Sequence, residues 1–343
     1  MRAKFALTTF VTLSTAAVAH AQSPSVPVTV DNFVRAESDR YFAAGLQQAG
    51  GQLGALHHDR DVASVDSQPV IRYNRDVLVS HGVFDLDAGP VTITLPDSGK
   101  RFMSILVVSE DHYNPIAAFG AGTYTLTKQN VGTRYATVAL RTFVDPNDAS
   151  DLAAARTLQD AVKVEQPGGP GKFEVPNWDQ ADLKKIRNAL LVLATSINDF
   201  KGAFGKKGEV DPIRHLIGTA AGWGGNPDSV ATYLNVTPPK NDGGTTYRLT
   251  VPANVPVDGF WGISLYNAQG YFEKNPYGAY NLNDVIARKN GDGSVTIQFG
   301  GCDGKTPNCL PIVEGWNYTV RLYRPREEIL NGTWKFPQAE ALN

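Results

Sequence analysis

Between residues 69 and 143 the chain alternates short hydrophobic runs with turns. Apolar, β-branched and aromatic residues gather in these runs, and Gly, Pro, Asn and Asp end them. Breaks about ten residues apart are typical of an antiparallel sandwich, because each run is long enough for one strand. The predicted strands span residues 77–86, 91–95, 102–108, 123–127 and 135–143.

A helical pattern dominates the middle of the chain. Residues 151–162 are rich in Ala and Leu, and apolar residues recur three and four positions apart after Asn177, which we expect to cap a helix. Asp211 followed by Pro212 predicts the start of a third helix. An earlier helix is predicted over residues 31–50, where a glycine pair ends it.

Strands return in the last third of the chain, over residues 247–251, 259–266, 294–299 and 318–323. The pattern therefore predicts a mainly β (α+β) fold, with two β-sandwich-like modules joined by a helical segment. The predicted divisions are a signal peptide at 1–21, an N-terminal helix and loop at 22–64, a β module at 65–147, a helical connection at 148–239 and a second β module at 240–343.

The first residues have the character of a secretory signal. Arg2 and Lys4 precede an apolar stretch that ends at Ala19-His20-Ala21, which is a small-residue cleavage site. The stretch is too short to span a bilayer, and no later segment is long and apolar enough to do so. We therefore expect a periplasmic or secreted protein without an integral membrane segment.

Composition excludes several classes of protein. The formal net charge is −2 and no basic block is present, which argues against a nucleic-acid partner. The sequence lacks the motifs of α/β-hydrolases, zincins, P-loop enzymes and dinucleotide-binding enzymes, so no cofactor and no metal is predicted. Cys302 and Cys309 are the two cysteines, and in an oxidising compartment their spacing favours a local disulfide.

The densest mixture of aromatic and polar side chains lies in residues 257–284. Tyrosines there alternate with amides and carboxylates, which suits a concave site that stacks a ligand and hydrogen-bonds its edges. The alternative is a sandwich corner whose tyrosines bury their rings and expose their hydroxyls. The candidate ligand-binding residues of this stretch are Trp261, Tyr266, Asn275 and Tyr280.

A second polar cluster precedes the first predicted strand. In an extended segment Arg72, Asn74 and Asp76 share one face and could orient a polar ligand. A buried salt bridge that holds two strands together is the alternative. Ser80 and His81 cannot form a catalytic dyad with each other, because adjacent strand residues face apart.

A third cluster, Glu110 to Tyr113, leaves the end of an apolar strand. A sheet can hold such residues rigidly, and an acid with a histidine can perform acid–base chemistry, so Asp111 and His112 join Asp76 as catalytic candidates. Tyr113 is a candidate ligand contact, and the alternative is a solvated turn. The pair His57-His58 is expected in an exposed loop, and His215 is expected to be a core or capping residue.

Two sets of motifs resemble a known family. The first half contains Asn74, Asp76, Leu78 and Ser80 in the order N-x-D-x-L-x-S, followed by Phe84-Asp85-Leu86 and Gly89-Pro90. The second half contains Phe260-Trp261, Leu265-Tyr266, Asn275-Pro276, Tyr280 and Arg321-Leu322-Tyr323-Arg324-Pro325. Over nearly all of the exported chain the sequence resembles the paired DUF1254/DUF1214 family of secreted bacterial proteins.

The resemblance implies two largely β modules with helical connections. Some members carry a carboxylesterase-like label. This chain departs from the family pattern at Val77, Val79 and Ala279, where Thr, Tyr and Arg are usual, and at Cys309, where Trp is usual.

Two functions fit these observations. The first is a periplasmic hydrolase that acts on a small or oligomeric polar substrate, with Asp76, Asp111 and His112 as acid–base groups. The second is a non-catalytic envelope protein that binds a glycan or another small ligand. Both predict that residues 72–81 and 257–284 meet and line one pocket. The pattern does not indicate an oligomeric state.

Overall fold

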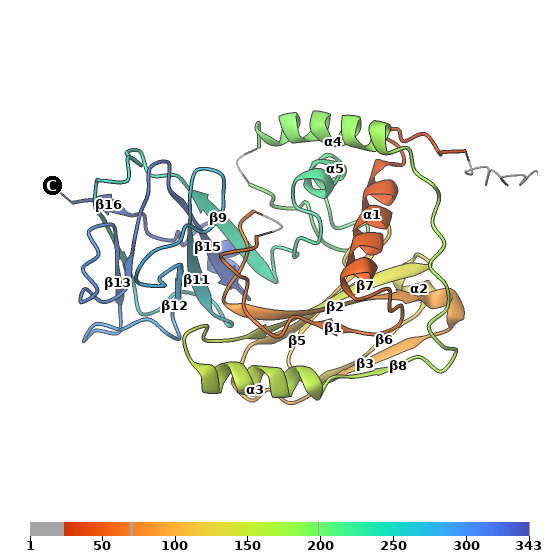
Figure 1. Ribbon diagram of the computed structural model, residues 1–343, viewed down its shortest axis with the longest axis horizontal. Coiled ribbons are helices and arrows are strands. Elements are labelled where there is room, and N and C mark those ends of the chain that lie inside the picture. The colour runs from red at the N-terminus through yellow and green to blue at the C-terminus, as the bar shows by residue number, and fades with distance from the viewer. Residues whose placement is uncertain (1–23, 69–70, 198, 343) are drawn as a thin grey trace, which may run out of the picture.

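The computed structural model describes residues 24–68, 71–197 and 199–342 (Figure 1). The predicted signal peptide lies outside these residues. The fold is mainly β with helices packed around it, as the hydrophobic pattern predicts. Within the described ranges, no helix is both long enough and apolar enough to cross a bilayer.

The first module is a sandwich of a five-stranded and a three-stranded sheet. The larger sheet has the order β1 (His57–His58), β2 (Val77–Asp85), β7 (Tyr135–Phe143), β4 (Met103–Ser109) and β5 (Ile116–Phe119). The smaller sheet has the order β6 (Gly122–Leu126), β3 (Val91–Leu95) and β8 (Lys163–Glu165). Apolar residues from both sheets form one core, among them Phe84, Ile93 and Leu140, each fully buried.

Helices cover both faces of the larger sheet. α1 (Phe33–Gln48) packs on the face opposite the smaller sheet, and α4 (Gln180–Ala194) and α5 (Pro212–Ala221) lie beyond it in Figure 1. α3 (Ala149–Asp160) lies on the other face. The short helices are η1 (Leu86–Ala88), α2 (Lys128–Val131) and α6 (Glu327–Leu330).

The second module contains two four-stranded sheets. One has the order β12 (Asn281–Asn283), β11 (Trp261–Tyr266), β15 (Asn317–Tyr323) and β9 (Ala231–Val236). The other has the order β14 (Cys309–Leu310), β13 (Val295–Phe299), β10 (Tyr247–Val251) and β16 (Glu340–Ala341). Between them lies an apolar core that includes Trp261, Ile263 and Phe299. Cys302 and Cys309 form the predicted disulfide.

Three local predictions differ from the structure. Asp179, rather than Asn177, caps α4, because its carboxylate accepts hydrogen bonds from the backbone N–H groups of Ala181 and Asp182. His57-His58 is a short strand paired with β2 rather than an exposed loop. β9 lies inside the segment predicted to be a helical connection, and its pairing with β15 makes it part of the second module.

Candidate functional site

One face of the sheet β12-β11-β15-β9 is polar, and it is buried along β12, β11 and β15 but exposed at Tyr233 and Asn235 of β9. Cross-strand register places Asn283, Gly262, Arg321 and Tyr233 in one row, and Asn281, Ser264, Thr319 and Asn235 in the next. The opposite face carries the apolar core of the second module. A sheet region covered on both sides normally has apolar residues on both faces, so packing alone does not account for the polar side chains of β12, β11 and β15.

Arg321 lies at the centre of the polar face and is 4% exposed. Its guanidinium donates to the hydroxyls of Ser264 and Tyr266 at 2.8 and 2.9 Å, and to the backbone carbonyl of Arg72 at 2.8 Å. Burial lowers the pKa of Arg321, but the neighbouring tyrosines and Asp76 more than offset this effect and raise it. Arg321 is therefore a fixed cation inside the protein.

Asp76 contacts the same face and is completely buried. Its Oδ1 accepts hydrogen bonds from the amides of Asn281 and Asn283 at 2.7 and 2.9 Å, while its Oδ2 has no partner among the described residues. Burial raises the pKa of this carboxyl, although the amides and Arg321 act in the opposite direction. A Cβ atom on Gly262 would lie 2.7 Å from Oδ2, so the carboxylate approaches a position that only glycine leaves open.

Residues 72–76, which we call the strap, connect the first module to this polar face. The backbone N–H of Arg72 donates to the carbonyl of Gly270, and the hydroxyl of Tyr266 donates to the carbonyl of Tyr73. The amide of Asn74 donates to the hydroxyl of Tyr323 at 2.7 Å. The two stretches predicted to meet and line one pocket are therefore in contact through hydrogen bonds, but no residue of 257–284 lines the cavity that lies beside the strap.

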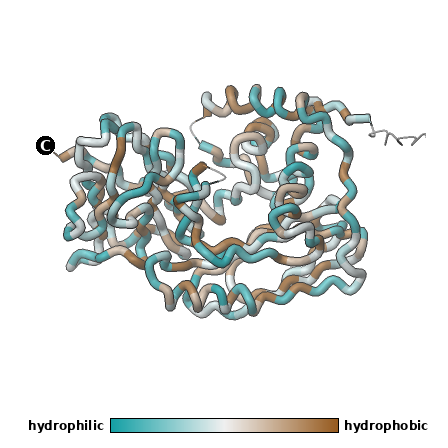
Figure 2. Tube along the Cα trace, in the orientation of Figure 1, coloured by the Kyte–Doolittle hydropathy of each residue, from teal (hydrophilic) through white to brown (hydrophobic). Residues whose placement is uncertain are grey.

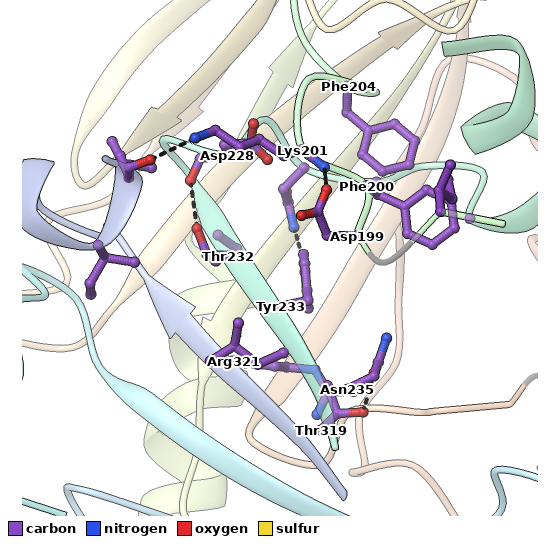
Figure 3. A pocket seen from close by; sticks show the side chains of 18 of the residues that line it. Asp199, Phe200, Lys201, Phe204, Asp228, Thr232, Tyr233, Asn235, Thr319 and Arg321 are labelled. Atoms are coloured by element: carbon purple, nitrogen blue, oxygen red, sulfur yellow. Dashed lines mark hydrogen bonds between the residues drawn. The ribbon is translucent and has the colours of Figure 1, made fainter. Parts of the chain in front are cut away.

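A cavity of about 540 Å³ lies beside the strap, over the β9 and β15 end of the polar face (Figure 3). Its polar side is formed by Arg72, Tyr233, Asn235, Thr319 and Arg321. Its apolar side is formed by Ile197, Phe200, Phe204, Ile329 and Leu330. In Figure 3 Phe200 and Phe204 lie at one end of the view, and Arg321, Asn235 and Thr319 lie at the other.

The polar end of the cavity carries two guanidinium groups, those of Arg72 and Arg321. Arg72 donates to Thr319 Oγ1, and burial together with the charge of Arg321 lowers its pKa. Within the described chain, neither Arg72 nor Arg321 has a carboxylate at ion-pair distance. At the other end of the cavity, the carboxylate of Asp199 is already paired with Arg214.

Arg72 also has an unusual backbone conformation, with φ at 54°. This left-handed region is costly for a residue with a side chain, and such strain concentrates at functional sites. Three contacts hold it there, namely those to Gly270, Arg321 and Thr319.

The three catalytic candidates are not brought together. Strands β2 and β4 run in the same direction because each pairs antiparallel with β7. Asp76 precedes β2, whereas Asp111 and His112 follow β4, so they lie at opposite ends of the sheet. For a strand of nine residues this separation is about 25–30 Å.

Asp111 and His112 make contacts that hold neighbouring parts of the fold together. Asp111 is paired with Arg35 of α1 at 2.5 Å. His112 is fully buried, its Nε2 accepts from the N–H of Gly224, and its Nδ1 donates to the hydroxyl of Thr219. Burial, with a smaller contribution from His215, lowers the pKa of His112 to about 3. Both ring nitrogens are therefore occupied in the neutral form.

The remaining ligand-binding candidates lie outside the cavity. Tyr113 stacks on His215, with ring centroids 4.7 Å apart. Trp261 faces the apolar core, because strand alternation places it opposite Tyr266, which contacts Arg321 on the polar face. Asn275 hydrogen-bonds within its own loop, and Tyr280 packs against Phe272 and lies under Arg75. Of the seven candidates, Arg72 alone lines the cavity.

Sequence reasoning did not single out Arg321, Thr319, Asn235 or Tyr233. A signal was present, because polar Asn317, Thr319, Arg321 and Tyr323 alternate with Tyr318, Val320 and Leu322. Polar residues at every second position of a strand, with an arginine among them, indicate either that this side of the strand faces solvent or that it lines a buried polar site.

Two family models match this chain. Residues 53–166 match a protein of unknown function (DUF1254), and residues 234–327 match a protein of unknown function (DUF1214). The chain belongs to the DUF1254/DUF1214 family. The strap lies in the DUF1254 match, and most of the polar face lies in the DUF1214 match.

Solved structures share the fold of this DUF1254/DUF1214 protein. The VPA0106 protein from Vibrio parahaemolyticus is similar with a TM-score of 0.72 and 17% identity, over 92% of this chain and 98% of that one. A putative uncharacterized protein from Burkholderia cenocepacia is similar with a TM-score of 0.52 and 12% identity, over 91% and 88% of the two chains. No curated protein matches the sequence.

Proposed function

We propose that this protein binds a small organic anion with an apolar body in the cavity beside the strap, and that it does so outside the cytoplasm. The observation that carries the proposal is the pairing of two guanidinium groups, Arg72 and Arg321, with an apolar wall in one cavity. The apparent secretory signal and the disulfide support the location.

The chemistry of the cavity favours an anion. A guanidinium presents several N–H donors in a rigid fork that suits a carboxylate or a sulfonate, and it does so best where water is excluded. An anion would also relieve the mutual repulsion of Arg72 and Arg321, which is one cause of the lowered pKa of Arg72. The phenylalanines and aliphatic residues opposite would bury the apolar body of the same molecule.

Binding without catalysis is the function that the geometry supports best. A hydrolase needs acid–base groups that converge on a common point in a pocket. Asp76 has no exposed surface, and Asp111 and His112 lie at the far end of the sheet. None of the three lines the cavity.

The first prediction concerns the anion contact. Anilinonaphthalene sulfonate should bind more tightly than phenylnaphthylamine, which has the same ring system without the sulfonate. In Arg72→Met the affinity for the sulfonate should fall by about tenfold or more, because a charge-assisted hydrogen bond typically contributes about 1.5–3 kcal/mol. Fluorescence titration of the purified exported chain measures both dyes.

Arg248→Met is the matched control for this titration. Arg248 is exposed on β10 in the same module, so its removal changes the net charge equally without touching the cavity. Equal loss of sulfonate binding in both variants would show a general charge effect and contradict the proposal. An unchanged affinity in Arg72→Met would contradict it as well.

A further inference from the structure

The outer side of the last turn of α4 is exposed and apolar. Leu191, Val192 and Leu193 are 40%, 69% and 52% exposed, respectively. Successive helical residues point about 100° apart, so three in a row cover most of the circumference of the helix. Leu190, the residue before them, is 5% exposed and packs in the core that α4 shares with α1 and α5, so the three exposed residues form the outer side of the last turn. Figure 1 shows α4 at the outer edge of the molecule, and Figure 2 shows brown, hydrophobic positions reaching this end of it.

A fourth exposed aliphatic side chain lies on α5, which packs against α4. Ile213, near the start of α5, is 71% exposed. Its neighbour Arg214 donates to the carbonyl and the carboxylate of Asp199, which fixes the start of α5 against the segment that follows α4. We call Leu191, Val192, Leu193 and Ile213 the apolar tip.

The apolar tip gathers exposed hydrophobic side chains on two helices that pack together. Among the described residues ten large hydrophobic side chains are exposed, and four of them belong to the tip. Single exposed hydrophobic residues are normal on a protein surface, but a cluster marks a surface that contacts something apolar. Three consecutive exposed apolar residues in a helix are likewise unfavourable unless they serve an interaction.

Positive charge accompanies the tip on the outer side of α4. Lys184 and Lys185 are exposed, and Lys185 precedes Val192 by seven residues, which is close to two full turns. In the part of the chain that the structure describes, neither lysine has a carboxylate at ion-pair distance. The outer side of the helix therefore changes from basic to aliphatic along its length.

We propose that the apolar tip and the two lysines of α4 dock on an anionic lipid surface. Aliphatic side chains on the outer side of a surface helix can insert among acyl chains, while adjacent lysines attract acidic headgroups. The tip includes no aromatic anchor of the kind that dominates protein–protein interfaces. The inference does not depend on the ligand proposed for the cavity.

The position of the tip connects it with the cavity. Ile197 follows the tip by a few residues, and both Ile197 and Phe200 line the apolar wall of the cavity. Docking through the tip would therefore hold this wall close to the lipid surface.

Vesicle flotation with the purified exported chain tests the docking surface. The protein should bind vesicles that contain phosphatidylglycerol more tightly than vesicles of phosphatidylcholine alone. Val192→Ser/Leu193→Ser should weaken binding to both kinds by about tenfold or more. Lys184→Gln/Lys185→Gln should weaken binding to the phosphatidylglycerol vesicles alone, by up to roughly 30-fold.

Val285→Ser is the matched control, because Val285 is 60% exposed on the second module and lies outside the tip. It should bind like the unaltered chain, and thermal melting should show that all variants are folded. The proposal is overturned if the unaltered chain binds neither kind of vesicle, or if Val285→Ser loses as much binding as the tip variant. It is also overturned if the tip variant instead abolishes self-association measured by light scattering, since the tip would then contact a second copy.

Discussion

Replacing Asp39 with asparagine should stabilise the protein at pH 8 by about 2–4 kcal/mol and should change its stability little at pH 4. Asp39 lies on α1 and is 2% exposed. Its Oδ2 accepts a hydrogen bond from the indole of Trp178, but its Oδ1 has no partner among the described residues. Burial raises the pKa of this carboxyl to about 7, the indole lowers it, and the charge of Glu110 raises it further.

The sign of the effect follows from linkage. The pKa of Asp39 in the unfolded chain is about 4, so between pH 4 and pH 7 the folded protein holds a proton that the unfolded chain has lost. The free energy of unfolding therefore falls as the pH rises through this interval, and the loss is complete above pH 7. An asparagine is neutral at every pH, and its amide can occupy the place of the protonated acid.

Urea denaturation at pH 4, 6 and 8 measures this difference. Asp31→Asn is the control, because Asp31 is exposed just before α1 and should show the same pH dependence as the unaltered protein. If Asp39→Asn and the unaltered protein differ by the same amount at all three pH values, proton binding by Asp39 is not the cause.

Replacing Gly262 with alanine should destabilise the protein by about 3 kcal/mol. The new methyl group would lie 2.7 Å from Asp76 Oδ2 and 3.3 Å from its Cγ, which is too close for either atom. Asp76 is held by Asn281 and Asn283, so the clash must move a hydrogen-bonded, buried carboxylate. Overpacking of this kind typically costs about 1–3 kcal/mol, and occasionally more.

A double-mutant cycle assigns the cost to this contact. In an Asp76→Ala background the Gly262→Ala change should cost much less than it does alone, because the clashing atoms are gone. Gly291→Ala is the control, since nothing lies within 4 Å of a Cβ atom built there. An equal cost in both backgrounds would mean that the carboxylate does not determine the requirement for glycine.

The fold could be predicted where alternation was strong. The predicted strands 91–95, 135–143 and 247–251 coincide with β3, β7 and β10. β9 could not be predicted, because Ala-Thr-Tyr-Leu-Asn-Val has only a weak strand pattern. It becomes a strand through pairing with β15, about ninety residues later. The local residue pattern of a segment does not reveal such long-range contacts.

The candidate site was predicted in part. The sequence indicated that the segment around Asn74 would contact the stretch around Tyr266, and the strap makes this contact. It did not reveal that Asp76 and Asp111 lie at opposite ends of a sheet, because that separation depends on strand order and direction. The cavity was missed for a related reason, since its walls come from β9, β15 and the loops around α5.

The strap also limits which rearrangements of the gene can give a folded protein. Its backbone carbonyls accept from Arg321 and Tyr266, and Asn74 and Asp76 satisfy polar groups of the second module. A gene that encoded the second module alone would leave a guanidinium and two asparagine amides without these partners. Recombination between related genes should therefore give a folded protein when both modules are exchanged together. The two domains should accordingly be encoded together in the same gene.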